Sequence, residues 1–318
     1  MLRGLESVGV ILIVFAVGYF FQYKKLWPES SPSALSSAVI RISAPCLAVT
    51  SIVASYDRET LASSIMLLLI ALLHLLVLYL LSKCGSRLLG LAGGRKAIFE
   101  NGFTFSNIIF IGLPINQIVF GESGMAPLFA YYIVSFTCFW SLGFFKVSTA
   151  ADPVTYGHGK RSVALKRILN PSIISVIIGY LLVQANLGLP LVLDTALGYL
   201  ANLTVPLSML VIGANLTMFG KGIPRITKDE IFVLIAKFLI SPLVMFILLK
   251  IFGVTGLPFY VFLLSSTMPC HMQSSIIAQQ YDVEPAFASK LVGLSTLFSI
   301  ITIPCYVALI HTLMLSAL

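Results

Sequence analysis

Charged residues are scarce in this sequence: Asp, Glu, Lys and Arg account for only 10% of its 318 residues. Soluble domains carry about 25% charged residues, so a water-soluble surface cannot be built from this composition. Hydrophobic residues make up 58% of the chain. They recur in apolar windows of about 20 residues, the length that crosses a hydrocarbon core about 30 Å thick. We therefore predict a polytopic membrane protein of the all-α class.

Motifs for catalysis and metal binding are also missing. The sequence has no HExxH, no GxSxG, no Walker loop and no paired carboxylates within an apolar window, although hydrolases, metalloproteases and nucleotide-binding enzymes are recognised by such patterns. The five cysteines show no CxxC spacing, which gives neither a metal knuckle nor a disulfide framework. We expect no enzyme activity, no metal site and no cofactor beyond a coupling ion.

Ten apolar spans are predicted, in two sets of five. Their approximate limits are 5–22, 34–54, 61–82, 97–120, 124–146, 168–186, 190–217, 230–252, 257–280 and 286–313. The longest polar insert, from Asp152 to Arg161, separates the two sets. The expected units are residues 1–147, a short cytoplasmic loop 148–167, and residues 168–318.

Basic residues predict the orientation of the chain. Despite a net charge of +8, nucleic acid is not an expected partner, because Lys and Arg lie in short loops between spans, where they set membrane topology. Fourteen of them follow spans one, three, five and seven, against three on the opposite side. Both termini are therefore expected outside a plasma membrane of the bacterial inner-membrane type. Because five is odd, the second half enters from the opposite side, so any internal repeat is inverted.

Two corresponding spans are interrupted by Pro and polar residues, at Ser106–Asn116 and Ser265–Ser275. In hydrocarbon, such interruptions persist only where protein or a water-filled cavity satisfies the backbone. Paired broken helices are typical of a midplane binding site in transporters. The second span of each half also carries one central proline, Pro45 and Pro206.

Candidate ligands lie at these interruptions. Helix N-termini can hold a carboxylate without Arg, which favours a site that uses backbone N–H groups together with neutral side chains. The candidate substrate-binding residues are Asn107, Gly112, Pro114, Pro269, Gln273, Ser274, Pro45 and Pro206. The alternative is structural: an Asn tie between helices, a Gly packing notch and Pro kinks.

Ion coupling has two candidate chemistries. His271 is the ionisable group nearest the second interruption, and His changes charge in the physiological pH range, so it could couple transport to protons; a neutral His tied to a neighbouring helix is the alternative. Oxygens of Thr204, Asn215 and Thr267 could instead hold sodium.

Charged residues inside the apolar spans form a separate set of hypotheses. Arg41 and Lys237 lie within spans, where charge indicates function by default, although their long side chains could snorkel to the interface. Glu100 is expected near the hydrated end of span four.

The motifs resemble a known family. Asn107-x4-Gly112-Leu113-Pro114, Pro206 to Asn215, and Met268-Pro269 to Tyr281 are similar to the auxin efflux carriers, including bacterial members. The resemblance implies an inverted five-plus-five fold like that of the bile-acid symporters. Spans 1, 2, 6 and 7 would form a scaffold, and spans 3–5 and 8–10 a transport domain whose fourth and ninth helices cross at their breaks. Plant members commonly have Pro before the span-four Asn, where this chain has Ser106.

The resulting hypothesis is a secondary active transporter of small organic anions, either auxin-like carboxylates or dicarboxylates such as malate, working by alternating access and coupled to H⁺, to Na⁺ or to neither. A membrane receptor or interaction module with a transporter-like fold is the main alternative, and a channel is a third. The expected partners are the carboxylate substrate and the lipid bilayer. Apolar scaffold surfaces also allow a homodimer.

Overall fold

The computed structural model describes residues 2–55, 58–151, 171–219 and 225–316, in which every regular element is helical. The first-half elements are α1 (Leu2–Tyr23), α2 (Ser31–Ala38), η1 (Val39–Ser43), α3 (Ala44–Ser55), α4 (Arg58–Leu88), α5 (Gly93–Thr104), η2 (Ile108–Gly112), α6 (Leu113–Phe120), η3 (Glu122–Gly124), α7 (Met125–Cys138), η4 (Phe139–Gly143) and α8 (Phe144–Thr149). Those of the second half are α11 (Pro171–Gln184), α12 (Leu191–Ala201), α13 (Thr204–Asn215), η5 (Leu216–Phe219), α14 (Lys228–Ile235), η6 (Ala236–Ile240), α15 (Ser241–Ile251), α16 (Gly256–Ser266), α17 (Gln273–Gln280) and α18 (Pro285–Ser316).

Six helical stretches of the described residues are long and apolar enough to cross a membrane: Ser31–Ala54, Ile65–Leu88, Glu122–Thr149, Leu191–Asn215, Lys228–Ile251 and Pro285–Met314. Four shorter apolar helices, Ile13–Tyr23, Ile108–Phe120, Ile173–Gln184 and Gly256–Ser266, lie in the remaining predicted spans to within one residue. The prediction of an all-α polytopic membrane protein is confirmed. The ten-span inverted repeat stays a prediction, and the central loop lies outside the described residues from 152 onward.

Proline explains the π turns in three of the spans. Pro45, Pro114 and Pro242 each occupy the second position of the α-helix that follows a π turn, η1, η2 or η6. A proline ring clashes with the carbonyl four residues earlier and has no N–H to donate to it, and a wider turn relieves both problems. In η6 the Tyr306 hydroxyl donates to the carbonyl oxygen of Phe238, four residues before Pro242. Pro45 and Pro114, which were candidate site residues, thus affect the site by changing the local geometry of the backbone.

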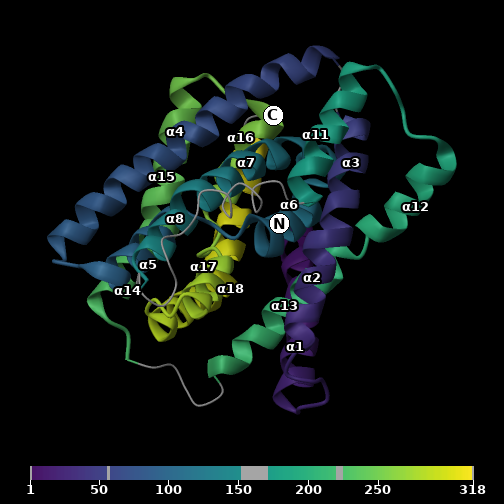
Figure 1. Cartoon of the computed structure of the whole chain (residues 1–318). Helices are drawn as coiled ribbons and strands as arrows, with labels where there is room; N and C mark the ends of the chain where they lie inside the picture. The colour runs from purple at the N-terminus through teal and green to yellow at the C-terminus, as the bar shows by residue number, and fades with distance from the viewer. Residues whose placement is uncertain (1, 56–57, 152–170, 220–224, 317–318) are drawn as a thin grey trace.

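The helices pack in two groups (Figure 1). The first helix group consists of α1, α2, α3, α11, α12 and α13, in which α1 packs along α13 and α3 packs against α11 and α12. The second helix group consists of α4 to α8 and α14 to α18, in which α4 packs against α5, α7 and α15. At the edge of the first group, α12 exposes Leu191 and Val192, as a lipid-facing helix would.

Glycine brings α1 and α13 into backbone contact. A Cβ atom at Gly213 would lie 2.9 Å from the carbonyl carbon of Phe15 and closer still to its oxygen. A Cβ at Gly18 would meet the backbone of Leu210 at 2.9 Å in the same way. Small residues permit this close approach between membrane helices. The pairing of α1 with α13 therefore depends on both glycines.

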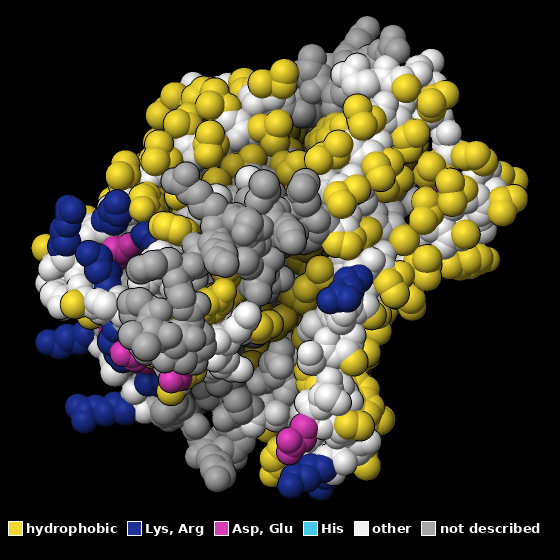
Figure 2. Space-filling model, viewed as in Figure 1, with side chains coloured by type: hydrophobic (Ala, Val, Ile, Leu, Met, Phe, Trp, Pro, Cys, Tyr) yellow, Lys and Arg dark blue, Asp and Glu magenta, His cyan; other side chains and the backbone are white. Residues whose placement is uncertain are grey.

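Basic side chains gather at one end of the molecule, over α5 and α14, whereas hydrophobic side chains cover much of the rest of the visible face (Figure 2). At this end Arg95 on α5 pairs with Asp229 on α14 at 2.7 Å. Lys290 on α18 pairs with Glu230 on α14 at 2.9 Å. These ion pairs tie three helices of the second group together.

The prediction that Glu100 lies at a hydrated helix end is wrong. Its side chain on α5 is buried and forms an ion pair with Lys146 on α8. The hydroxyl of Ser86 on α4 donates to the same carboxylate at 2.7 Å. A buried carboxylate requires such partners because desolvation disfavours an isolated charge. This ion pair was not predictable from the sequence, because Lys146 is 46 positions from Glu100.

We expect Lys146→Met to destabilise the protein by about 3 kcal/mol, since it leaves the buried carboxylate of Glu100 without its partly exposed cationic partner. The measurement is thermal unfolding of the purified protein in detergent. The double variant Glu100→Gln with Lys146→Met should recover most of the loss, because no charge is then stranded. Equal destabilisation of the single and double variants would contradict this assignment.

Candidate functional site

The two interrupted helices meet at their breaks, which we call the crossover and define as Phe105–Asn107 together with Thr267–Met272. The backbone N–H of Asn107 donates to the carbonyl of Pro269 at 2.8 Å, and the N–H of His271 donates to the carbonyl of Phe105 at 3.2 Å. Ser106 and Cys270 lie opposite each other in this antiparallel bridge. These two short segments thereby satisfy backbone groups that the broken helices leave free, as a membrane interior requires.

The first break is organised by Asn107. Its side-chain oxygen accepts from the N–H of Phe110 at 3.3 Å and so caps η2. Its carbonyl accepts from the N–H of Gly112 at 3.1 Å. A Cβ at Gly112 would lie 3.3 Å from Met268, so this glycine lets the two broken helices approach each other. Pro114 lies buried at the start of α6, after the break itself.

The second break is held by backbone contacts. Besides the Pro269 carbonyl already described, the N–H of Cys270 donates to the Ser295 hydroxyl of α18 at 3.1 Å. Thr267 is fully buried, and its hydroxyl donates to the carbonyl of Leu264 at 2.7 Å.

Polar groups face the start of α17. The N–H of Gln273 donates to Nδ1 of His271 at 3.2 Å, and the N–H of Ser274 to the His271 carbonyl at 3.1 Å. The Ser274 hydroxyl and the Gln273 side-chain oxygen are buried and have no hydrogen-bond partner among the described residues. The His271 ring stacks on Phe139, with ring centroids 4.1 Å apart and planes 3° from parallel. The N–H of Gln273 and the ring of Phe139 therefore hold the His271 ring in place.

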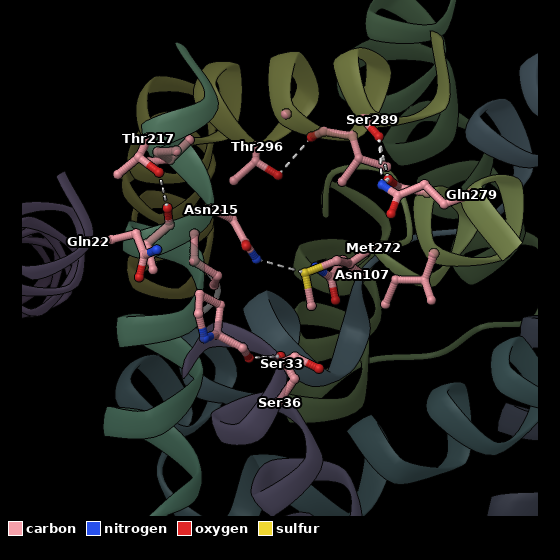
Figure 3. Close-up of a pocket in the computed structure, with 18 of the residues that line it drawn as sticks. Gln22, Ser33, Ser36, Asn107, Asn215, Thr217, Met272, Gln279, Ser289 and Thr296 are labelled. Carbon is pink, nitrogen blue, oxygen red and sulfur yellow. Dashed lines mark hydrogen bonds between the residues drawn. The ribbon is translucent and has the colours of Figure 1, made fainter. Parts of the chain in front are cut away.

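A cavity of about 680 Å³ lies between the two helix groups and reaches the crossover. Its lining residues in the described part of the chain are Gln22, Glu29, Pro32, Ser33, Ser36, Asn107, Ile212, Ala214, Asn215, Leu216, Thr217, Met272, Ser275, Ile276, Gln279, Ser289, Val292, Gly293 and Thr296. Figure 3 shows Asn215 of α13 directed at Met272, with Asn107 beside it. The Asn215 amide donates to the Met272 sulfur at 3.2 Å, so one contact joins the two groups at the cavity wall.

The cavity brings together only some of the predicted site residues. Asn107 and Asn215 line it. The predicted residues that do not line it are Gly112, Pro114, Thr267, Pro269, His271, Gln273 and Ser274 around the crossover, and Pro45, Thr204 and Pro206 in the first helix group. Thr204 is fully buried at the start of α13 and its hydroxyl has no partner among the described residues. Pro206 is exposed on the same helix. Pro45 follows the π turn η1. These three positions shape or support the first helix group.

The intramembrane cations differ in their surroundings. Arg41 is exposed, as the snorkelling alternative requires. Lys237 does not snorkel: its side chain is 0% exposed, and Nζ donates to the Ser106 hydroxyl at 3.1 Å. The contact of Lys237 with the crossover was not predictable from the sequence, because Lys237 and Ser106 are 131 positions apart. The one available signal was a Lys in an apolar span five residues before Pro242.

A second buried polar cluster lies beside Lys237. His74 of α4 contacts the Ser241 carbonyl through Nε2 at 3.1 Å and the Tyr131 hydroxyl through Nδ1 at 3.2 Å. The Ser241 hydroxyl in turn donates to the carbonyl of Ser266, the last residue of α16, at 2.7 Å. His74 therefore ties three helices of the second group to the end of a broken one.

A family model described as "Membrane transport protein" matches residues 4–307. The chain belongs to this family. The match covers nearly the whole sequence and confirms the resemblance to the auxin efflux carriers. The chain is therefore a membrane protein of a transport family, with several apolar helices.

Three proteins of similar sequence are also described as transporters. An "Uncharacterized transporter" of Methanothermobacter thermautotrophicus is 25% identical over 95% of this chain and 96% of its own length. Another of Methanocaldococcus jannaschii is 26% identical over 94% of this chain and 96% of its own. A "Putative malonate transporter" of Rhizobium meliloti is 24% identical over 70% of this chain and 72% of its own. None of these descriptions names an enzyme.

Proposed function

We propose that the chain is a secondary active transporter of small carboxylates, with malonate-like and malate-like dicarboxylates or auxin-like acids as substrates, and that it works by alternating access at the crossover. The observation that carries the proposal is the cavity of about 680 Å³ that runs between the two helix groups to Asn107. Small-molecule sites commonly have volumes of 300–1,000 Å³. The malonate named for a relative is a dicarboxylate of suitable size.

The binding chemistry follows from Asn107 at the cavity wall and from the start of α17, where Gln273 and Ser274 lie in sequence between the lining residues Met272 and Ser275. The Asn107 amide can donate to a carboxylate oxygen while its own oxygen keeps the cap on Phe110. The unpartnered Ser274 hydroxyl at the start of α17 supplies another donor, and the positive end of that helix favours an anion. Asn107, Gln273 and Ser274 are accordingly the proposed contacts, whereas Gly112, Pro114 and Pro269 shape the backbone around them.

Transport would consist of movement of the second helix group, as the transport domain, against the first, as the scaffold. The cavity is lined by Gln22, two residues before the basic pair Lys24 and Lys25, and by Thr217. Under the positive-inside rule this is the cytoplasmic side, so the cavity corresponds to an inward-facing conformation. A homodimer through the scaffold is part of the proposal, with the exposed face of α12 as its contact.

Reconstituted protein is expected to move radiolabelled malonate, malate or indole-3-acetate into proteoliposomes, in the presence of an imposed proton or sodium gradient or without either. Protein-free liposomes provide the background. The experiment also separates a carrier from the receptor alternative, because a receptor binds a carboxylate without moving it. Binding without uptake of any member of the panel would contradict the proposed function.

A further inference from the structure

Lys237 is a buried cation without a carboxylate partner. Its side chain lies in the π turn η6, is 0% exposed, and has one hydrogen bond, to the Ser106 hydroxyl of the crossover at 3.1 Å. Among the described residues, no Asp or Glu oxygen lies within 4.0 Å of its nitrogen. An ammonium has three donors, so two of them lack an acceptor at hydrogen-bond distance in the part of the chain that the structure describes.

The groups around Lys237 supply no compensating negative charge. Ser106, Cys270 and His271 face it from the crossover, and its charge acts on the latter two. His74 approaches from α4 at Ser241, one turn along the helix, and Tyr306 of α18 bonds to the carbonyl of Phe238. The acidic residues on Lys237's own helix lie at its far end, where Arg95 and Lys290 pair with them.

Lys237 and Ser106 do not line the cavity, but Ser106 directly precedes the lining residue Asn107, so the charge on Lys237 is expected to respond to an anion bound beside Asn107. An isolated ammonium in a low-dielectric interior is costly, so a lone buried lysine favours the neutral amine. A carboxylate beside Asn107 would change that balance, because Asn107 lines the cavity and is bonded in sequence to Ser106, the partner of Lys237. Opposite charges a few ångströms apart in such a medium attract strongly.

We propose that Lys237 binds the coupling proton, which it takes up together with the carboxylate substrate. The inference rests on the proposed function. With substrate bound, the amine accepts H⁺ and the ammonium compensates the anion; when the anion leaves on the other side, the proton leaves too, and the empty carrier returns with a neutral amine. Because linkage is reciprocal, substrate tightens proton binding as much as the proton tightens substrate binding. The cation is thus supplied by the chain, and no sodium ion is required.

Two substitutions at Lys237 separate the parts of this cycle. Lys237→Met has no proton site, so malonate uptake should lose its response to an imposed pH gradient and malonate-dependent acidification of the liposome lumen should fall at least tenfold. Lys237→Arg keeps a permanent cation, since Arg does not deprotonate in proteins; it should still exchange external for internal malonate but lose net uptake, because an empty carrier with a lone charge cannot return. Lys250→Met, which removes an exposed cation from the end of α15, is the matched control and should behave like the unsubstituted protein.

The measurement uses full-length protein in proteoliposomes with a trapped pH-sensitive dye and radiolabelled malonate, without sodium. Thermal unfolding with and without malonate identifies variants that are folded and bind, because a ligand raises the melting temperature of the state it binds. Substrate-driven acidification that persists in Lys237→Met would overturn the proposal. So would net uptake by Lys237→Arg equal to that of the unsubstituted protein.

His271 is the competing proton site, and its variant distinguishes the two. In the structure its Nδ1 accepts the N–H of Gln273 and its ring stacks on Phe139, which holds one nitrogen in the unprotonated form. His271→Gln is therefore expected to keep the pH response of malonate uptake, and loss of that response would favour His271 over Lys237. If the unsubstituted protein takes up malonate without any accompanying proton, only the proposed role of Lys237 is rejected, and the proposed function stands. If the unsubstituted protein takes up no carboxylate, the proposed function itself is rejected.

Discussion

Gly213→Ala is expected to destabilise the protein by about 3 kcal/mol or more, among the largest effects that a single methyl group can have. The added carbon would lie 2.9 Å from the carbonyl carbon of Phe15 and 2.9 Å from the backbone nitrogen of Tyr19, and nearer still to the Phe15 oxygen. These neighbours are backbone atoms in a regular helix, so they cannot rotate away as a flexible side chain could. Relief requires α1 and α13 to separate, and that contact holds the first helix group together.

The check is the apparent melting temperature in detergent, supported by the yield of monodisperse protein. Gly198→Ala is the matched control, because a Cβ at Gly198 in α12 would meet nothing within 4 Å and Ala is the better helix former. Gly18→Ala should resemble Gly213→Ala, since it opens the same contact from the other side. Melting temperatures for Gly213→Ala and Gly198→Ala that agree within error would contradict the close packing of α1 with α13.

Asn107→Ala is expected to reduce carboxylate transport by about ten- to a hundredfold. A hydrogen bond to a charged group contributes about 1.5–3 kcal/mol, and each 1.4 kcal/mol corresponds to a factor of ten in affinity. The substitution also removes the acceptor that caps η2 at Phe110. Loss of transport by this variant alone would therefore not distinguish a binding role from a structural one.

Asn107→Asp makes that distinction. Aspartate caps a helix as well as asparagine does, so the bond from the Phe110 N–H is retained, but its carboxylate repels an anionic substrate and cannot donate to it. We expect this variant to fold normally and to fail in malonate binding and uptake. Asn202→Ala, at an exposed position between α12 and α13, is the control. Normal malonate uptake by Asn107→Asp would show that Asn107 only caps the helix.

The interruptions themselves were predictable from the sequence. Polar residues and proline at mid-span cannot be accommodated in a lipid-exposed helix, and the helices do break around Asn107 and Pro269. The position of the first break differs from what Pro114 would suggest: the chain leaves the helix at Phe105, and Pro114 opens the following helix. Proline is compatible with the first turn of a helix, so it marks a start there.

The partners of the buried charges were not predictable. Lys237 and Glu100 looked able to reach water, because each lies only a few residues from a predicted span end. In the structure neighbouring helices cover both, and their partners, Ser106 and Lys146, come from distant segments. Periodicity and local spacing carry no information about such contacts. A site at the interruptions was predicted, and Asn107 and Asn215 do line the cavity. The contact of Asn215 with Met272 was not predictable, since these residues meet only through packing.

Counterflow tests the central claim, alternating access to one carboxylate site, most directly. Proteoliposomes are loaded with a high concentration of unlabelled malonate, diluted into a trace of labelled malonate, and followed with no ion gradient imposed. A carrier exchanges one molecule for another, so labelled malonate should accumulate transiently above its external concentration, and Asn107→Asp should abolish the accumulation. Equilibration without overshoot would indicate a channel, and the absence of any labelled malonate inside would indicate a receptor; either result would contradict the account.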